Sequence, residues 1–317
     1  MINETRYQGF SAVEIETDLL KVIVLPDLGG KIISVLNKKS GFDCAFINPF
    51  TGLVRYPYDV EYLTSDCGIG DLLPSIGVGY YTDIPWKGIP LPDKGEIWTQ
   101  PLETTLLSTG LEQKTYGVRF PYHFARTLEV NGNVVTLDYT LENLCPFDLK
   151  YLWSLQPHLR ISGKMEIVAS GTPAFYVDWS KNYAFETQER LYDWPMARPK
   201  NCDKEIDFSR IETMTGDAEK LYLTGFDQGS VSLLYKDEGE KVTFRFDPSV
   251  IPNCGLWINK EGWPVEGNST RLVAIQPCNC MSDFFEVTDR HGVIGVVKGK
   301  GKNRWRIEMA FDSFAKP

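Results

Sequence analysis

The sequence predicts an all-β protein that folds as a large antiparallel β-sandwich. Short alternating or apolar segments recur, with turn signals roughly every 8–12 residues, and a helical period is almost absent. The chain has 317 residues, of which 43% are hydrophobic, so it can bury a large core. No low-complexity linker divides it, and we therefore expect residues 1–317 to form a single domain.

The N-terminal region is predicted to open with paired strands. Ala12–Thr17 alternates between apolar and polar residues, and Leu20–Leu25 is a short apolar run. The turn-forming residues Asp27-Leu28-Gly29-Gly30 follow, and Lys31–Leu36 then has the composition of a returning strand.

Residues 41–100 form the least regular part of the chain. Glycine, proline and aromatic residues recur within Gly68–Gly77 and Asp83–Trp98. A long loop region of this kind is uncommon inside a compact domain unless it lines a site, although it could also be a rigid cover over one sheet face. The candidate site residues in this region are Asp71, Asp93, Glu96 and Trp98.

The rest of the chain is predicted to be a series of strands. His123–Val130 and Asn133–Asn143 flank Asn131-Gly132, a strong signal for a two-residue hairpin turn. Ser209–Lys220 is the one segment here for which we expect a short helix. Further strands are expected at Leu221–Tyr235, Lys241–Phe246, Gly255–Asn259, Arg271–Gln276, Gly292–Val297 and Arg304–Ala310.

The segment Tyr151–Ile161 has the pattern of a half-buried strand with one polar face. Its odd positions are mostly apolar, whereas Gln156, His158 and Arg160 fall on even positions and should project from one side. Pro157 cannot donate a ladder hydrogen bond and therefore predicts a sheet edge or a bulge. An ordinary surface strand whose polar face meets water would show the same alternation.

Charge and composition exclude several classes of partner. The formal net charge is −9 and the pI is near 5.0, so we expect neither nucleic acid nor an anionic membrane as the main partner. The first residues lack the apolar region of a secretory signal, and no apolar run approaches the roughly 18 residues of a membrane helix. The seven cysteines lack paired spacing except for Cys278 and Cys280, which indicates a reduced, cytoplasmic protein.

No cofactor or metal ion is expected. Phosphate-binding loops, nucleotide fingerprints and nucleophile elbows are absent from the sequence. The Cys278-Asn279-Cys280 segment has no second Cys/His pair at zinc-type spacing, so we expect no metal site there.

Two strand-end glutamines suggest a concave site for a neutral, hydroxyl-rich ligand. Gln156-Pro157 ends one polar strand face and Gln276-Pro277 ends another. An amide both donates and accepts hydrogen bonds, as a sugar hydroxyl does. Tryptophans near these segments could stack on the C–H face of a sugar ring, although core packing is the alternative for each. They are Trp98, Trp153, Trp257 and Trp263.

Several segments resemble the galactose mutarotase-like superfamily, and in particular the divergent bacterial proteins related to aldose 1-epimerase. They are, in chain order, Gly29-Gly30-Lys31-Ile32, Asp71-Leu72-Leu73-Pro74-Ser75-Ile76, Leu91-Pro92-Asp93-Lys94-Gly95-Glu96-Ile97-Trp98, Leu152-Trp153-Ser154-Leu155-Gln156-Pro157, Gly255-Leu256-Trp257-Ile258-Asn259 with Gly262-Trp263-Pro264, and Ala274-Ile275-Gln276-Pro277. The resemblance implies the β-supersandwich fold and a small-molecule sugar as the partner.

The resemblance also implies that the usual acid and base are replaced. In mutarotases a Glu takes the proton from the sugar's anomeric hydroxyl and a His gives one to the ring oxygen. By this resemblance, this chain has Gln156 at the position of the His and Gln276 at the position of the Glu. Because an amide does not exchange a proton near neutral pH, ordinary mutarotation by this pair is not expected.

Two functions therefore stay open. The first is an isomerase of the aldose 1-epimerase type, with His158 as the acid and a carboxylate from Asp71, Glu96 or Asp93. The second is a catalytically silent sugar-binding or sensing protein. Unrelated chemistry on the same fold, such as a lyase or isomerase for uronates, is a third alternative. In each case Gln156, Gln276, Asp93, Trp98, Trp257 and Trp263 are candidate sugar-binding residues. Arg160 and Lys31, together with Arg55, would suit an acidic or phosphorylated sugar.

Overall fold

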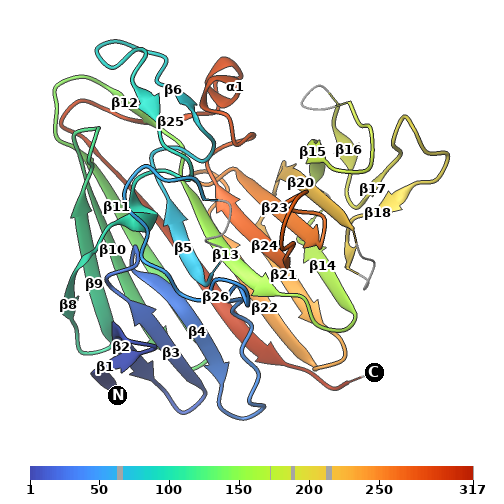
Figure 1. Ribbon diagram of the computed structural model, residues 1–317, viewed down its shortest axis with the longest axis horizontal. Coiled ribbons are helices and arrows are strands. Elements are labelled where there is room, and N and C mark those ends of the chain that lie inside the picture. The colour runs from blue at the N-terminus through green and yellow to red at the C-terminus, as the bar shows by residue number, and fades with distance from the viewer. Residues whose placement is uncertain (63–66, 172, 187–189, 212–215, 317) are drawn as a thin grey trace.

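The computed structural model describes residues 1–62, 67–171, 173–186, 190–211 and 216–316. Nearly all regular elements are antiparallel strands, so the prediction of an all-β sandwich is confirmed. Figure 1 shows the long strands of two large sheets, with helix α1 (Phe285–Arg290) and several of the short strands at one end. No helix of the described chain is long and apolar enough to cross a membrane.

The larger sheet has 11 strands and contains both glutamines. In spatial order its strands are β1 (Ile2–Tyr7), β2 (Phe10–Glu16), β3 (Leu20–Leu25), β4 (Lys31–Asn37), β5 (Ile69–Leu72), β13 (Ser154–Arg160), β24 (Arg271–Cys278), β23 (Asn253–Lys260), β20 (Asp217–Thr224), β15 (Ala174–Ser180) and β16 (Tyr192–Asp193).

The second sheet has 9 strands and covers one face of the first. Its order is β19 (Arg210–Ile211), β14 (Met165–Ala169), β21 (Gly229–Tyr235), β22 (Glu240–Phe246), β26 (Lys302–Ser313), β11 (Val134–Asn143), β10 (Tyr122–Asn131), β9 (Gly110–Tyr116) and β8 (Glu103–Leu106). The remaining elements are β6 (Gly79–Tyr80), β7 (Pro90–Leu91), β12 (Leu149–Tyr151), β17 (Met196–Ala197), β18 (Ile206–Asp207), β25 (Gly295–Val297) and the 3₁₀-helix η1 (Ile97–Thr99).

The turn before β4 fixes the loop region of residues 90–100 against the sheet. Gly29 has a φ of +64°, and a Cβ atom there would lie 2.7 Å from the Cα of Trp98. Only glycine tolerates both the left-handed backbone and this close approach to η1. The predicted opening strands therefore form, and their turn also positions part of the wall of the site described below.

The β10–β11 hairpin forms where the sequence predicts it, with the turn one residue later. Asn131 pairs with Val134, so Gly132 and Asn133 are the turn residues, and Gly132 has a φ of +58°. The shift keeps the alternation of both arms, and Leu128 and Leu137 face each other in the core.

The predicted helix at Ser209–Lys220 is wrong for the residues that the structure describes. Arg210–Ile211 and Asp217–Thr224 are the strands β19 and β20, and residues 212–215 lie outside the described chain. The charged residues of β20 resemble the polar face of a helix in sequence. In the folded protein Asp217, Glu219 and Lys220 are nevertheless almost fully buried in the sheet. The structure's own helix, α1, was not predicted.

Glu219 makes the stability of the protein depend on pH. Burial raises the pKa of Glu219 to about 7, against an opposing effect of Lys260, and Asp217 adds to the rise. A carboxyl with a raised folded-state pKa contributes stability that is fully present below about pH 4.5 and is lost as pH rises through about 7. We expect Glu219→Gln to raise the free energy of unfolding at pH 8 by about 3 kcal/mol.

The same substitution should have little effect at pH 4, where both forms of residue 219 are neutral. Urea unfolding of both proteins at the two pH values measures the difference, and the exposed Glu4→Gln is the matched control. A stability gain of equal size at pH 4 and pH 8 would contradict the assignment to the Glu219 carboxylate.

Candidate functional site

The two Gln-Pro segments lie side by side at the centre of the larger sheet. β13 and β24 pair with Ser154 opposite Cys278 and His158 opposite Ala274, and the ladder is interrupted between these points. The register on either side places Gln156 opposite Gln276. Pro157 and Pro277 lie in this interval and have no N–H to donate, which explains the gap. Pro157 predicted a sheet edge or a bulge; the edge is wrong, because β13 is a central strand, and the irregularity is the interruption of the β13–β24 ladder.

The two amides contact each other directly. Gln276 Nε2 donates a hydrogen bond to Gln156 Oε1, and Gln156 Nε2 lies 3.0 Å from His158 Nε2. Gln156 is opposite Gly70 in β5 and Gln276 is opposite Gly255 in β23. The absence of a side chain at these glycines makes room for their neighbours, because Lys31 packs over Gly70, and Gln276 and Tyr222 pack over Gly255.

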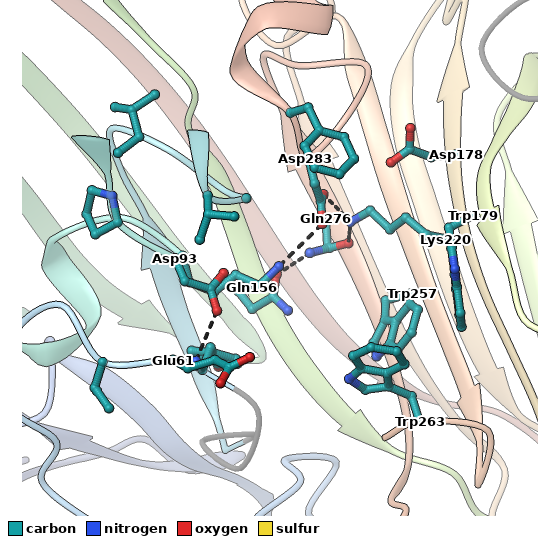
Figure 2. Close-up of a pocket in the computed structure, with 18 of the residues that line it drawn as sticks. Glu61, Asp93, Gln156, Asp178, Trp179, Lys220, Trp257, Trp263, Gln276 and Asp283 are labelled. Atoms are coloured by element: carbon teal, nitrogen blue, oxygen red, sulfur yellow. Dashed lines mark hydrogen bonds and ion pairs between the residues drawn. The ribbon is translucent and has the colours of Figure 1, made fainter. Parts of the chain in front are cut away.

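The two glutamines line a cavity of about 730 Å³ on the sheet face turned away from the 9-stranded sheet. Figure 2 shows Gln156 and Gln276 at its centre, with Asp93 and Glu61 on one side and the tryptophans on the other. The described residues that line it include Asp59–Tyr62, Gly77, Val78, Leu91–Lys94, Gln156, Asp178, Trp179, Lys220, Trp257, Trp263, Gln276, Asp283 and Phe284.

Three tryptophans form a continuous aromatic wall of this cavity. The ring centroid of Trp179 lies 5.8 Å from that of Trp257 and 5.5 Å from that of Trp263. Trp257 and Trp263 were candidates from the sequence, whereas Trp179 was not. A β-bulge in β15 between Val177 and Trp179 shifts the register there, and sequence alternation gives no sign of it.

A partly buried cluster of charged groups adjoins the glutamines, and sequence reasoning missed it. Lys220 Nζ lies 2.5 Å from Gln276 Oε1 and 3.2 Å from Asp283 Oδ1. Asp283 also contacts Lys94 Nζ at 3.3 Å and accepts a 2.6 Å hydrogen bond from the Tyr222 hydroxyl. Burial opposes ionisation, but the two ammonium groups and Tyr222 hold the pKa of Asp283 well below its ordinary range. Asp283 is therefore a carboxylate and a weak base.

His158 is not placed to act as a general acid. Its side chain is 1% exposed and is not among the described residues that line the cavity. Burial and the nearby Lys31 ammonium lower the pKa of His158 to about 3, although a hydrogen bond with the Cys67 backbone acts in the opposite direction. The imidazole is neutral at physiological pH, so the structure does not support its predicted role as proton donor.

Asp71 projects into the core rather than into the cavity. In β5, Gly70 faces the cavity side opposite Gln156, and Asp71 points to the other face opposite Leu155. There it forms a 2.6 Å ion pair with Arg126 of β10, and both side chains are fully buried. Trp153 Nε1 donates to the same carboxylate at 3.2 Å. The predicted catalytic role of Asp71 therefore has no geometric support, and Trp153 is a core residue.

Glu96 is a structural carboxylate whose acceptor capacity is used within the protein. It accepts hydrogen bonds from the hydroxyls of Tyr58 and Tyr122 at 3.0 and 2.8 Å, and from the backbone N–H groups of Val118 and Arg119 at 2.9 Å each. Its side chain is buried and does not line the cavity. Glu96 is therefore not the catalytic carboxylate that the sequence suggested.

Of the other candidates in the loop region, Asp93 lines the cavity and Trp98 supports it from behind. Asp93 Oδ2 accepts a 3.0 Å hydrogen bond from the backbone N–H of Tyr62. The backbone carbonyl of Asp93 accepts a 3.1 Å hydrogen bond from Trp98 Nε1. Trp98 packs edge-on against Tyr62, with ring centroids 4.8 Å apart. Lys31 Nζ lies 5.5 Å from the Trp98 ring, so Lys31 is a buried support and not a cavity residue.

Arg160 is also remote from the ligand side of the cavity. Its guanidinium stacks on the ring of Phe42, with 4.5 Å between the guanidinium carbon and the ring centroid. Neither Arg160 nor Arg55 is among the described cavity residues. The expected contact of these arginines with an acidic sugar is therefore not supported.

Comparison with solved structures identifies the fold. A galactose mutarotase-like protein from Lactobacillus casei has a TM-score of 0.71 at 13% identity, over 95% of this chain and 100% of that one. The chain has the galactose mutarotase-like fold. A galactose mutarotase related enzyme from Lactobacillus acidophilus gives a TM-score of 0.68 at 15% identity, covering 96% of this chain and 98% of the other. A galactose mutarotase-like protein from Clostridium acetobutylicum gives a TM-score of 0.67 at 10% identity and is matched over 99% of both chains.

Sequence comparison adds little to this structural likeness. A family described as a domain of unknown function, DUF5107, matches residues 1–59. No curated protein matches the chain significantly. The galactose mutarotase-like fold is thus recognised through its architecture, as the short resembling segments predicted.

Within the galactose mutarotase-like fold, no metal centre is apparent among the described residues. No group of three or more His, Cys, Asp or Glu side chains there is arranged to hold an ion. All seven cysteines are free thiols. Cys278 and Cys280 are fully buried, and the Cys278 thiol lies 3.4 Å from the Cys280 carbonyl oxygen, so both are packed inside the sheet end.

Proposed function

We propose that the cavity binds an aldose or a sugar derivative and does not equilibrate its anomers at the rate of a mutarotase. The observation that carries this proposal is the hydrogen-bonded Gln156–Gln276 pair at the centre of the cavity, beside the wall of three tryptophans. The likeness to galactose mutarotase-like structures supports a sugar as the ligand.

The chemistry of the lining suits a polyhydroxylated ring. Amides and carboxylates around the cavity can hydrogen-bond ligand hydroxyls, and the indole faces can stack on the C–H face of the ring. Five of the charged lining residues are acidic and two are basic, namely Asp59, Glu61, Asp93, Asp178 and Asp283 against Lys94 and Lys220. This balance disfavours a phosphorylated or otherwise multiply anionic ligand.

Fast proton exchange lacks suitable groups at the centre of the cavity. Gln156 and Gln276 do not titrate. The His158 imidazole is neutral near pH 7, so it cannot act as an imidazolium acid. Asp71 and Glu96 are committed to structural contacts elsewhere. Each positioned acid or base contributes about 10²–10⁴-fold, so amides at both central positions should remove most of a mutarotase's advantage over water, even though Asp93 and other carboxylates line the cavity.

Polarimetry together with a thermal melt tests the proposal. Freshly dissolved α-D-glucose or α-D-galactose should mutarotate with purified protein no faster than in buffer. The same sugars, or derivatives of them, should raise the melting temperature in a concentration-dependent manner. A protein-dependent rate that disappears in His158→Ala would instead establish an epimerase with His158 as its acid.

Loss of the aromatic wall should weaken binding. We expect Trp257→Ala to raise the dissociation constant of a bound sugar roughly tenfold, because stacking on an aromatic ring contributes about 0.5–1.5 kcal/mol beyond its buried area. Isothermal titration calorimetry measures the change. Trp194→Ala is the matched control, because Trp194 packs against Phe175 and does not line the cavity. Equal losses of affinity in the two variants would count against the tryptophan wall as the stacking surface.

A further inference from the structure

Lys220 is a buried ammonium that faces the cavity, and sequence reasoning did not single it out. It lies in β20 opposite Trp257, and its side chain is 8% exposed. A buried charge is costly unless it is paired and hydrogen-bonded. Asp283 supplies the opposite charge, and the Tyr222 ring lies 4.9 Å from Lys220 Nζ.

The lysine fixes the orientation of both glutamine amides. An ammonium can only donate, so the Gln276 atom that lies 2.5 Å from Lys220 Nζ must be the carbonyl oxygen. Gln276 therefore turns its NH₂ group toward Gln156, whose carbonyl oxygen must accept. The NH₂ group of Gln156 then faces His158 Nε2, which accepts because the imidazole is neutral. Hydrogen bonds thus run in one direction, from Lys220 to His158.

Gln156, Gln276 and Lys220 form the floor of the cavity. The direction of their hydrogen bonds determines which donors and acceptors remain for a ligand. Within this row of hydrogen bonds, each amide uses one of its two N–H donors and one of its two carbonyl lone pairs, which leaves one N–H and one lone pair on Gln156 and on Gln276. Lys220 has three N–H donors, and two acceptors from the described residues, Gln276 and Asp283, engage two of them. With the third N–H of Lys220, these three side chains therefore have more N–H donors than carbonyl lone pairs left for a ligand, and the carboxylates of Asp93 and Asp178 supply further acceptors at the two sides of the cavity.

We propose that Lys220, with Asp283 as its counter-ion, orients the Gln276–Gln156 row so that the cavity favours a sugar presenting a carbonyl or carboxylate oxygen to the floor over one presenting a hydroxyl. The ligand class is thus an aldonolactone or a sugar acid in preference to the parent aldose. A carbonyl-type oxygen accepts from several N–H donors at once, whereas a hydroxyl also brings a proton that needs an acceptor. This inference rests on the proposed function, because it concerns the same cavity.

Calorimetric titration of the full-length protein with matched sugars tests it. The probes are D-gluconolactam and D-galactonolactam, which are stable carbonyl analogues of the two aldoses, D-gluconate and D-glucuronate, and D-glucose and D-galactose. We expect a lactam or an acid to bind about tenfold more tightly than the matching aldose, as charge-assisted hydrogen bonds allow. Tight lactam binding that salt does not change identifies the neutral carbonyl. Binding of the acids alone, weakened by salt, identifies the carboxylate.

Equal or tighter binding of the aldoses would overturn this inference while leaving the proposed sugar-binding function in place. Absence of binding by every sugar in the panel would overturn both.

Two variants test the part played by the lysine. Lys220→Met retains the length of the side chain and removes the donor, so the preference for carbonyl ligands should fall to about threefold or less. Gln276→Glu still accepts from Lys220 but cannot donate to Gln156, so the preference should shift toward the aldose. The exposed Lys87→Met, outside the cavity, is the control and should keep the wild-type ratio. An unchanged ratio in folded Lys220→Met, or in Gln276→Glu if the first variant does not fold, would contradict the role of Lys220.

Discussion

Replacing Gln156 with His and Gln276 with Glu should increase protein-dependent mutarotation by about 10²-fold or more. The double variant puts a titratable acid and base at two positions that lie opposite each other on neighbouring strands in the cavity. Each positioned proton-transfer group contributes about 10²–10⁴-fold, and we take the low end of the combined effect because the Lys220 ammonium beside the new carboxylate would lower its basicity. Polarimetry with fresh α-D-glucose and α-D-galactose measures the rate.

The single variants Gln156→His and Gln276→Glu are the controls for this experiment. Each supplies only one partner of the pair and should give a much smaller increase than the double variant. The expectation fails if the wild-type protein already equilibrates the anomers as fast as the double variant, since the glutamines would then not be the missing groups.

Removal of Arg126 should destabilise the protein by about 3–5 kcal/mol. The guanidinium is fully buried and pairs with Asp71, and it also donates to the Gly30 carbonyl and to Gln113. Arg126→Met would leave the Asp71 carboxylate without a counter-charge in the core, where burial already raises its pKa. Urea unfolding of the variant measures the loss.

A second substitution separates the unpaired charge from lost packing. In Arg126→Met/Asp71→Leu both charges are gone, and much of the stability should return, because apolar residues often replace a buried ion pair at little cost. A double variant no more stable than the single one would show that packing or the bonds to Gly30 and Gln113 dominate. Sugar binding should persist in both variants, since neither residue lines the cavity.

The fold and the centre of the site could be predicted because their signals are local. Alternation in residues 151–161 places Gln156 and His158 on one face of a strand, and the structure has them there. The repeated Gln-Pro pattern indicates two similar strand ends, and it marks the interval in which Gln156 and Gln276 meet. Both inferences depend only on the period of a strand and on the chemistry of proline.

The other features of the candidate site depend on contacts between residues far apart in the chain. Asp71 has the same local appearance as a cavity carboxylate, and only its pairing with Arg126 of the other sheet reveals a core role. Lys220 could have been placed in the cavity if residues 217–224 had been recognised as a strand, but their charges resemble the surface of a helix. Asp283 reaches the site from the segment after β24, for which the sequence shows no period.

The contacts of Glu96 have a kinetic consequence for ligand capture. Four hydrogen bonds join this carboxylate to Tyr58, Tyr122 and the backbone at residues 118 and 119, so the neighbouring segment with Asp93 is fastened to β10. The side of the cavity that contains Asp93 is therefore held in place before a sugar binds. Because this described side of the cavity needs no rearrangement, we expect association in a single exponential phase whose rate rises linearly with sugar concentration.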